Sequence, residues 1–351
     1  MINNGKKSIL IIKLDAIGDY ILFRNFLEEI KKSDLYKDYK ITFLGNVVVK
    51  DLVENLDKEF VDSFIWFNKK EINKNPLKIL KIINLIITKK FNIVVNTSYS
   101  RRFIGDLFVK LSRSKDKIGF RGDCNNISLK YKKITDKWYN RLIDINKKNV
   151  FEFYKNREFF SIILNRETQI KKPFIDKTII NLNKISLPDN FVVLFPGASA
   201  NKKKWFKDNF IKISEYLINN YKFNIIICGS DEDKINFENE KFFDMTGKTN
   251  LMQLIYIISK SKLIISNDTS GAHIGTALDI PTIVLSQFNH YGRFFPYPSE
   301  ISEKNICLTP DIFNNLSREE LIEKFKLGSD IDISLLSVDK VKKAIDLILK
   351  K

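Results

Sequence analysis

The sequence predicts an α/β protein built from two doubly wound, Rossmann-like domains. Three observations lead to this prediction. Short apolar runs of strand length alternate with segments whose apolar residues recur at helical spacing, the pattern of βαβ units in parallel sheets. The chain has 351 residues, more than one hydrophobic core usually serves. A polar, proline-containing passage over residues 165–189 separates two series of these units and is the candidate linker.

The first half opens with a βα unit. Residues 8–12 form a continuous apolar strand, and after a turn at residues 15–19 the apolar residues recur at helical spacing. Ligand-binding residues of a parallel sheet lie just past the carboxyl end of a strand, so Gly18 and Asp19 are candidate site residues. Asp19 is also compatible with a helix N-cap. The turn has no GxGxxG motif, which argues against a dinucleotide site.

Later segments of the first half continue the alternation. We expect strands at residues 40–44, 64–67 and 91–96, and helices at residues 76–90 and 151–164. The helix at 76–90 is amphipathic and basic, which is typical of a helix that covers a sheet, with binding to a membrane surface as the alternative. Arg101 and Arg102 follow the strand at 91–96, where they are either a solvated basic face or part of an anion-binding wall.

The second half repeats this organisation. We expect strands at residues 191–195, 223–228, 263–265 and 282–285, and helices near residues 207–220, 251–259, 272–277 and 338–349. The turn at 268–271 leads directly into one of these helices. A helix N-terminus presents unpaired N–H groups and the positive end of the helix dipole, so this turn suits a phosphate. Thr269 and Ser270 add hydroxyl donors, Gly271 permits close approach of a ligand, and His273 lies just inside the helix.

Positive charge is concentrated in the first half. The formal net charge is +17, of which residues 1–170 carry +14 and residues 171–351 carry +3. An A+T-rich genome would raise the lysine content of both halves alike, so it does not explain this asymmetry. The first half is therefore predicted to meet an anionic partner, and nucleic acid, anionic lipid and phosphorylated saccharide all fit.

Cysteines and paired carboxylates give little support for a metal centre. The three cysteines lie far apart and lack metal-ligand spacing, as in a reduced cytoplasmic protein. The segments 231–233 and 330–332 match an Asp-x-Asp metal pattern, but two acidic residues at this spacing often occur by chance. We expect no metal and no other cofactor. We also expect neither a signal peptide nor a membrane span.

Motifs from both halves together resemble one known family. They are IIKLDAIGDYILF at residues 11–23, PGAS at 196–199, Lys203 two positions before Trp205, SNDTSGAH at 266–273 and ALDIPTIVL at 277–285. In this order and spacing the motifs are similar to those of glycosyltransferase family 9, the family of the ADP-heptose:lipopolysaccharide heptosyltransferases. The resemblance implies a GT-B fold with two Rossmann-like domains facing a central cleft. It implies an acceptor domain at 1–170, a donor domain at 171–335, and a last helix within 336–351 that returns to the first domain.

The resemblance also implies roles for residues of the first half. Asp19 corresponds to the family's proposed base, which takes a proton from the acceptor hydroxyl. We expect Gly18, Arg101 and Arg102 to contribute to acceptor binding. The strand end that often reads Asp-x-Gln-Gly in the family reads Asn-Thr-Ser-Tyr here at residues 96–99, so the acceptor stays open.

Donor binding is implied for the second half. Lys203 corresponds to the phosphate-binding lysine, with Ser199 as a hydroxyl donor, and Lys202 and Lys204 remain alternatives because residues 202–204 are all lysine. The remaining implied donor residues are Asp233 at the ribose and Asp268, Thr269, Ser270, Gly271 and His273 at the phosphate turn. Many members have glycine where Ser270 stands. Arg293 is a further candidate for the donor phosphates, and His290 is interpreted as a loop-packing residue.

The sequence thus predicts a metal-independent, inverting glycosyltransferase. It would move a heptose or related sugar, with ADP-heptose as the expected donor, to an anionic lipopolysaccharide or lipooligosaccharide core acceptor. It would be cytoplasmic and attached peripherally to the inner face of the membrane. Alternatives are a GT-B transferase with another donor sugar for surface polysaccharide or protein glycosylation, and a sugar-nucleotide epimerase or hydrolase. A non-catalytic nucleic-acid-binding protein is the alternative of another class, but no helix-turn-helix, zinc or RNP-like pattern supports it.

Overall fold

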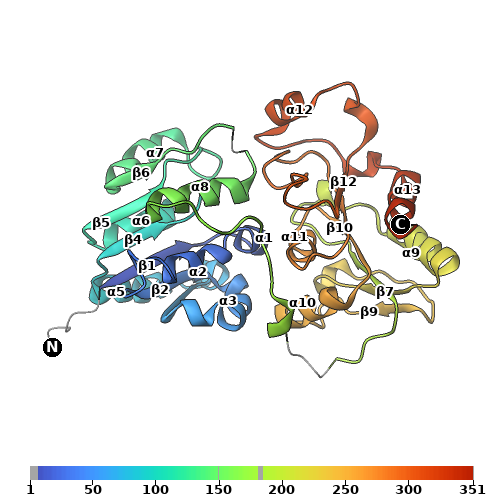
Figure 1. The fold of residues 1–351 in the computed structure, drawn as a ribbon, viewed down its shortest axis with the longest axis horizontal. Helices are drawn as coiled ribbons and strands as arrows, with labels where there is room; N and C mark the ends of the chain where they lie inside the picture. The colour runs from blue at the N-terminus through green and yellow to red at the C-terminus, as the bar shows by residue number, and fades with distance from the viewer. Residues whose placement is uncertain (1–6, 149, 181–184, 351) are drawn as a thin grey trace. The chain divides into compact units, whose positions relative to one another are not determined.

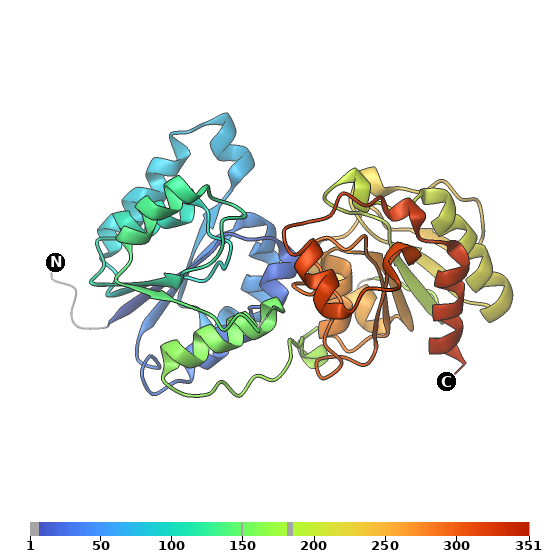
Figure 2. The same cartoon turned by 90° about the horizontal axis from the view of Figure 1, so that it is seen from above.

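Two compact units, Met1–Lys171 and Lys172–Lys351, divide the chain. The structure is a computed structural model that describes residues 7–148, 150–180 and 185–350. The division falls within the candidate linker at 165–189, of which residues 181–184 lie outside the described residues. Each unit contains a six-stranded sheet with helices on both faces (Figures 1 and 2). This architecture confirms the prediction of an α/β fold with two doubly wound sheets.

The N-terminal sheet has the strand order β3-β2-β1-β4-β5-β6, and its strands are parallel. The strands are β1 (Ser8–Lys13), β2 (Lys40–Asn46), β3 (Ser63–Phe67), β4 (Ile93–Asn96), β5 (Asp116–Phe120) and β6 (Arg141–Ile143). The chain runs from β1 to one edge, returns to β4 and then proceeds to the other edge. The carboxyl ends of β1 and β4 therefore flank the switch point, where doubly wound sheets bind their ligands.

Helices cover this sheet on both faces. They are α1 (Ile17–Ile21), α2 (Asn25–Lys31), α3 (Lys50–Leu56), α4 (Lys69–Lys74), α5 (Lys78–Lys89), α6 (Phe103–Leu111), α7 (Leu129–Thr135) and α8 (Glu152–Leu164). Helices α5, α6 and α7 lie side by side on one face, and α2 packs with α8 on the other (Figure 2). Ile82 and Ile86 of α5 are buried against Val94 of β4, so α5 covers the sheet with its apolar side, as expected.

The C-terminal sheet has the equivalent parallel order β12-β11-β10-β7-β8-β9. Its strands are β7 (Phe191–Phe195), β8 (Asn224–Ile227), β9 (Phe242–Asp244), β10 (Leu263–Asn267), β11 (Thr282–Leu285) and β12 (Asn305–Leu308). Its helices are α9 (Lys207–Tyr221), α10 (Leu251–Lys260), α11 (Ser270–Ala277), α12 (Arg318–Phe325) and α13 (Val338–Leu349). Here β7 and β10 flank the switch point. Among the described residues, no helix combines the length and apolar character needed to cross a bilayer.

The last helix, α13, belongs to the core of the C-terminal unit. Its residues Val341, Ala344 and Ile345 are buried together with apolar residues of α9 and of the central strands. Asp346 of α13 accepts hydrogen bonds from Tyr216 (2.6 Å) and Tyr221 (2.5 Å) of α9. The apolar face of α13 is therefore covered by α9 and the sheet of its own unit, and the return of this helix to the first domain stays a prediction.

A buried charge network joins three helices of the N-terminal unit. Asp57, directly after α3, accepts hydrogen bonds from the Tyr20 hydroxyl of α1 (2.5 Å) and from two nitrogens of Arg24, the N-cap of α2 (2.8 and 3.1 Å). The side chains of Arg24 and Asp57 are only 4% and 1% exposed. A buried cation of this kind depends on its partner, because water cannot replace the carboxylate.

We predict that Asp57→Ala destabilises the N-terminal unit. The substitution leaves the Arg24 guanidinium buried without its carboxylate, which should lower the free energy of unfolding by about 3–5 kcal/mol. Urea denaturation followed by circular dichroism measures this loss. Asp34→Ala is the matched control, because it removes the surface ion pair of Asp34 with Lys37 and should change stability little. An equal effect of the two substitutions would contradict the assignment.

Candidate active site

Three loops of the C-terminal unit meet at the carboxyl edge of its sheet. They follow β8, β7 and β10, which are neighbours in that order. Asn267, the last residue of β10, donates a hydrogen bond to the carbonyl of Pro196 (2.6 Å) and accepts one from the backbone N–H of Trp205 (3.3 Å). One amide side chain thereby holds both ends of the loop after β7 against the turn after β10.

Trp205 anchors the lysine run that precedes it. Its side chain is buried, its indole N–H donates to the carbonyl of Leu336 (2.9 Å), and its ring packs edge-on against Phe210 of α9. The three lysines that precede Trp205 therefore extend from an anchored point of the backbone.

The three consecutive lysines lie at three different carboxylates. The nearest carboxylate oxygens belong to Asp330 for Lys202 (2.9 Å), Asp268 for Lys203 (3.8 Å) and Asp233 for Lys204 (3.3 Å). Lys203 is thus the lysine that reaches the turn after β10. Its side chain is 15% exposed, whereas that of Lys202 is 58% exposed. Of the three lysines, Lys203 is therefore the candidate for the predicted phosphate contact at this turn.

The carboxyl group at this turn is poorly solvated. Burial raises the pKa of Asp268, while the charges of Lys203 and His290 oppose the shift, and the resulting pKa lies above the ordinary value. The backbone N–H of Asp268 donates to the carbonyl of Leu285 (3.0 Å), which ties the turn to the end of β11. The Asp268 carboxyl therefore lies in a largely buried position beside the Lys203 ammonium.

The first turn of α11 has the features of an anion site. Thr269 is the N-cap, and its side chain accepts no hydrogen bond from the helix. Ser270, at the first helical position, is half-buried. Gly271 lies against Phe195 of β7, and a Cβ at this position would come within 2.8 Å of the phenyl ring. The glycine is therefore required for helix packing at this site, in addition to the ligand approach that the sequence indicated.

His273 is a packed, neutral side chain. Its Nδ1 lies 2.8 Å from the hydroxyl oxygen of Tyr297, and its ring stacks on Phe295 at a centroid distance of 4.5 Å. Burial and the charge of Lys203 lower the pKa of His273 to about 3. Near neutral pH the imidazole therefore has no positive charge to offer to a phosphate, although it lies in the first turn of α11 as expected.

Asp233 and Ser199 line the same edge of the sheet. Asp233 accepts hydrogen bonds from the backbone N–H (2.9 Å) and the hydroxyl (2.7 Å) of Ser230. Burial alone would raise the pKa of Asp233, but these bonds and Lys204 outweigh it and hold the pKa below the ordinary value. A Cβ on Gly197 would lie 2.4 Å from an Asp233 oxygen, so the loops after β7 and β8 touch here. Ser199 is exposed on the first of these loops.

A buried lysine gathers polar groups at the switch point of the N-terminal sheet. Lys13, the last residue of β1, lies 2.9 Å from an Asp15 oxygen and donates a hydrogen bond to the Thr97 carbonyl (3.3 Å). The same Asp15 oxygen accepts a hydrogen bond from the Ser98 hydroxyl (2.6 Å). These contacts join the loop after β1 to the loop after β4.

Lys13 stays charged although it is almost fully buried. Burial lowers its pKa, but the carboxylates of Asp15, Asp19 and Glu152 raise it more, so the pKa lies above the ordinary value. The positive charge of Lys13 therefore acts on Asp19. Asp19 and Gly18 are half-buried in α1, whose N-cap is Ala16. The alternative interpretation of Asp19 as the N-cap is wrong.

The two adjacent arginines have different environments. Arg101 is fully buried, where it pairs with Asp106 (3.4 Å) and with Asp136 and lies over the ring of Tyr139 (4.8 Å). These contacts tie the loop after β4 to the segment after α7, so the burial of Arg101 does not support the expected acceptor contact. Arg102 is exposed at the start of α6 and keeps that candidate role.

Several residues at the switch points of the two sheets could not be predicted from the sequence. Asp15 and Ser98 are ordinary loop residues, and only the contacts of Asp15 with Lys13 and with the Ser98 hydroxyl reveal them. A lysine at the end of an apolar strand was a signal for Lys13 itself. Tyr297 meets His273 from an aromatic segment 24 residues further along the chain, and no spacing rule connects the two.

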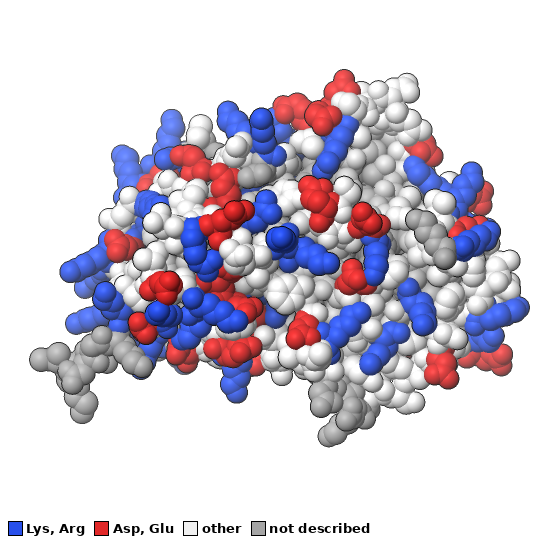
Figure 3. Space-filling view, viewed as in Figure 1, with Lys and Arg blue, Asp and Glu red and all other residues white. Residues whose placement is uncertain are grey.

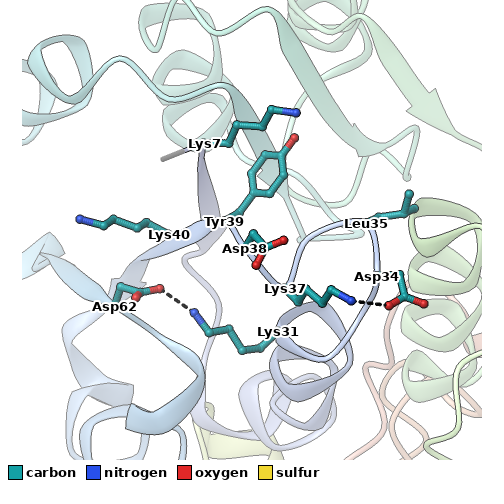
Figure 4. Close-up of a pocket in the computed structure, with 9 residues that line it drawn as sticks. All are labelled: Lys7, Lys31, Asp34, Leu35, Lys37, Asp38, Tyr39, Lys40 and Asp62. Carbon is teal, nitrogen blue, oxygen red and sulfur yellow. Dashed lines mark hydrogen bonds and ion pairs between the residues drawn. The ribbon is translucent and has the colours of Figure 1, made fainter. Parts of the chain in front are cut away.

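A separate hollow of about 680 Å³ lies at the opposite, amino edge of the N-terminal sheet (Figure 4). It is lined by Lys7, Lys31, Asp34, Leu35, Lys37, Asp38, Tyr39, Lys40 and Asp62. Figure 4 shows Lys31 paired with Asp62 (3.1 Å) and Lys37 paired with Asp34 (2.8 Å). Carboxylates within the hollow already neutralise these lysines, so we assign it no ligand.

Comparison with known proteins identifies the family. The sequence profile of glycosyltransferase family 9 (heptosyltransferase) matches residues 89–317. The chain belongs to glycosyltransferase family 9. It is therefore a glycosyltransferase, and the switch-point loops described above are its candidate active site.

Relatives that match most of this chain support the assignment to family 9. The lipopolysaccharide core heptosyltransferase OpsX of Haemophilus influenzae is 23% identical over 319 residues, which is 85% of this chain and 84% of OpsX. The family 9 glycosyl transferase of Veillonella parvula has a TM-score of 0.74 at 17% identity over 99% of both chains. The E. coli heptosyltransferase WaaC with ADP has a TM-score of 0.70 at 15% identity over 97% of both chains. These structural similarities show a shared GT-B fold.

We predict that His273 makes the enzyme less stable in acid. Between its folded pKa of about 3 and the ordinary value of 6.5, the unfolded chain binds a proton that the folded chain does not. Stability is therefore complete above the ordinary pKa and falls as the pH drops towards the folded one. His273→Asn should reduce this loss, measured as the difference in free energy of unfolding between about pH 7 and about pH 4.5.

The matched control is His290→Asn, which removes the other histidine and leaves His273 in place. It should keep the acid dependence of the wild type. If His273→Asn and the wild type lose the same free energy of unfolding on acidification, His273 is not a buried, neutral side chain in the folded protein.

Proposed function

We propose that this family 9 enzyme transfers a heptose from ADP-heptose, with inversion at the anomeric carbon, to a lipopolysaccharide or lipooligosaccharide core acceptor. The relative OpsX is a lipopolysaccharide core heptosyltransferase, and WaaC, which shares the fold, was solved with ADP. The observation that carries the proposal is the approach of Lys203 to the turn that begins α11. It places a cation next to the N-terminus of α11, an arrangement that suits a diphosphate leaving group.

On the donor side, the diphosphate lies between Lys203 and the first turn of α11. The ammonium and the helix N-terminus stabilise the negative charge that develops as the bond between the sugar and the phosphate oxygen breaks. The hydroxyls of Ser199, Thr269 and Ser270 donate to phosphate oxygens. Asp233, whose lowered pKa keeps it ionised, accepts hydrogen bonds from the ribose.

On the acceptor side, Asp19 acts as the general base. The acceptor oxygen attacks the anomeric carbon from the face opposite the leaving group, its proton passes to the Asp19 carboxylate, and the bonding electrons leave with ADP. Lys13 supplies a fixed positive charge beside Asp19 and binds Asp15, which positions the loop after β1. Gly18 and Arg102 contribute to acceptor binding, and the net charge of +14 in residues 1–170 suits an anionic core saccharide.

We propose that the reaction needs no metal ion, because Lys203 and α11 supply the positive charge. Three of the four aspartates in the two Asp-x-Asp segments have local partners. Asp233 binds Ser230 and Lys204, Asp330 pairs with Lys202, and Asp332 accepts from the backbone of Ser334 (2.8 Å). Transfer should therefore continue in EDTA, and a requirement for a divalent ion would overturn this part of the proposal.

The enzyme is proposed to work in the cytoplasm, attached peripherally to the inner face of the cytoplasmic membrane, where the glycolipid acceptor would be presented. A donor screen by nucleotide release distinguishes ADP-heptose from UDP- and GDP-sugars. Release with another donor alone would favour the alternative of a transferase for surface polysaccharide or protein glycosylation.

We predict that Lys203→Met weakens ADP binding by about 10- to 100-fold, because it removes a charge-assisted contact with the diphosphate. Isothermal titration calorimetry measures the affinity. Lys202→Met is the matched control, since Lys202 pairs with Asp330 and does not reach the turn after β10. Unchanged affinity in Lys203→Met would assign the phosphate contact to Lys204 instead.

We predict that Asp19→Asn lowers transfer at least about 100-fold, because the amide cannot accept the proton of the acceptor hydroxyl. ADP affinity should stay at the wild-type value, since Asp19 belongs to the N-terminal unit and not to the donor loops. Heptose transfer to a core oligosaccharide is followed by ADP release. Asp51→Asn, a carboxylate on α3, is the control, and full turnover in Asp19→Asn would exclude it as the base.

A further inference from the structure

Exposed apolar side chains are concentrated on one helical layer of the N-terminal unit. Of the 17 large hydrophobic side chains exposed among the described residues, seven lie on the three adjacent helices α5, α6 and α7 or at the start of α5. They are Leu77, Leu80, Leu85, Phe103, Leu129, Tyr131 and Ile134. Such clustering on one side of a unit marks an interaction surface more often than scattered exposure does.

The densest part of this layer is the α6–α7 face. We define it as the exposed apolar residues Phe103, Leu129, Tyr131 and Ile134 with the half-buried Trp138 and the cations Arg102, Lys110, Lys130, Lys133 and Lys137. Phe103 packs edge-on against Tyr131 (5.8 Å) and Trp138 (5.7 Å). The three rings form one cluster that the two helices present together.

Positive charge surrounds this aromatic cluster. The ammonium of Lys110 lies over the Trp138 ring at 4.6 Å, and Lys130, Lys133 and Lys137 are exposed. Arg102 is the fifth cation of this face. Within the part of the chain that the structure describes, none of the five has a carboxylate at ion-pair distance. Figure 3 shows Lys and Arg side chains projecting along the side of the N-terminal unit where α7 lies in Figure 1.

The nearby carboxylates do not balance this charge. Asp106 of α6 is fully buried and pairs with Arg101. Asp136, directly after α7, binds Arg101 and Lys132. Because both carboxylates pair with Arg101 or Lys132, they do not neutralise the exposed cations. The α6–α7 face is therefore both positively charged and apolar.

We propose that the α6–α7 face docks on a bilayer that contains anionic phospholipids. Lysines near an anionic leaflet gain electrostatic energy, and exposed aliphatic and aromatic side chains gain by entering the interfacial region, where Trp and Tyr are favoured. A nucleic acid would use the lysines but would leave Leu129 and Ile134 without apolar contact. The combination of unpaired cations and exposed aliphatic residues therefore fits a membrane better.

The α6–α7 face begins at the edge of the sheet that holds the proposed acceptor site. Arg102 follows the loop after β4, whose residues Thr97 and Ser98 contact Lys13 and Asp15. Docking through this face would bring the carboxyl edge of the N-terminal sheet to the bilayer. The inference deepens the proposed function by naming the surface that meets the lipid, and it rests on that function only for the nature of the acceptor.

The test compares vesicle binding of two matched double variants. Lys130→Gln/Ile134→Gln removes one cation and one exposed aliphatic residue four positions apart on α7. Lys343→Gln/Leu347→Gln removes the same two kinds of side chain at the same spacing on α13. Both variants change exposed positions and should fold. Binding is measured by co-sedimentation with vesicles of phosphatidylcholine alone and of equal parts phosphatidylcholine and phosphatidylglycerol.

The wild type should bind the phosphatidylglycerol vesicles in preference to the neutral ones, and added salt should weaken binding. The α7 variant should lose about tenfold or more in affinity for these vesicles, and the α13 variant should bind like the wild type. Equal binding to both kinds of vesicle, or equal binding by the three proteins, would overturn the proposal. Duplex DNA binding that depends on Lys130 without vesicle binding would assign the face to nucleic acid instead.

Transfer to a delipidated core oligosaccharide separates this inference from the proposed function. The α7 variant should keep wild-type turnover on that soluble acceptor, because none of its substitutions lies at the donor or acceptor site. Loss of turnover in the α7 variant would show a role other than docking. If the wild type binds vesicles but transfers no heptose, the docking proposal would stand and the proposed function would be refuted.

Discussion

The parallel pairing of β7 with β10 is the interaction on which the C-terminal site depends. The two strands are far apart in sequence, yet their pairing places Ser266 beside Phe195. The loop after β7, which carries Lys203, then lies next to the turn that begins α11. Asn267 and Gly271 make this approach close, the first by hydrogen bonds to both ends of the loop and the second by leaving room for Phe195. The N-terminal unit uses the same principle, since β1 and β4 pair and Lys13 bridges their loops.

Positive charge occurs in three different environments in this protein. Arg24, Arg101 and Lys13 are buried, and each is matched by carboxylates that hold loops or helices together. Lys203 is partly open and lies at a carboxyl group whose burial raises its pKa. The net charge alone cannot separate these classes, because a buried ion pair contributes to the unit's internal structure and an open cation contributes to ligand binding. The α6–α7 face adds a third set of cations, which are exposed and have no carboxylate at ion-pair distance among the described residues.

The fold was predictable where apolar patterns were strong. The strands at 191–195 and 282–285 and the helix at 338–349 were predicted with the bounds that the structure has. By contrast, β5, β6, α6 and α7 were not predicted, and of their region only Arg101 and Arg102 were interpreted, as a solvated basic face or part of an anion-binding wall. The strands β5 and β6 have only five and three residues, and β6 forms the sheet edge, so tertiary packing contributes more to them than local pattern does.

The sequence by itself determined the doubly wound fold, the two units and the family, because these follow from periodicity and from motifs contiguous in the chain. It also predicted a phosphate-binding turn at the start of α11, because one segment carries all the residues of that prediction. Only the tertiary structure decided which lysine of three reaches that turn, that Arg101 is an internal ion-pair partner, that His273 is neutral, and that α13 packs on α9. Each of these outcomes depends on groups distant in sequence and on burial. Burial strongly changes the energy of a charged group, and the local sequence pattern does not show which groups will be buried.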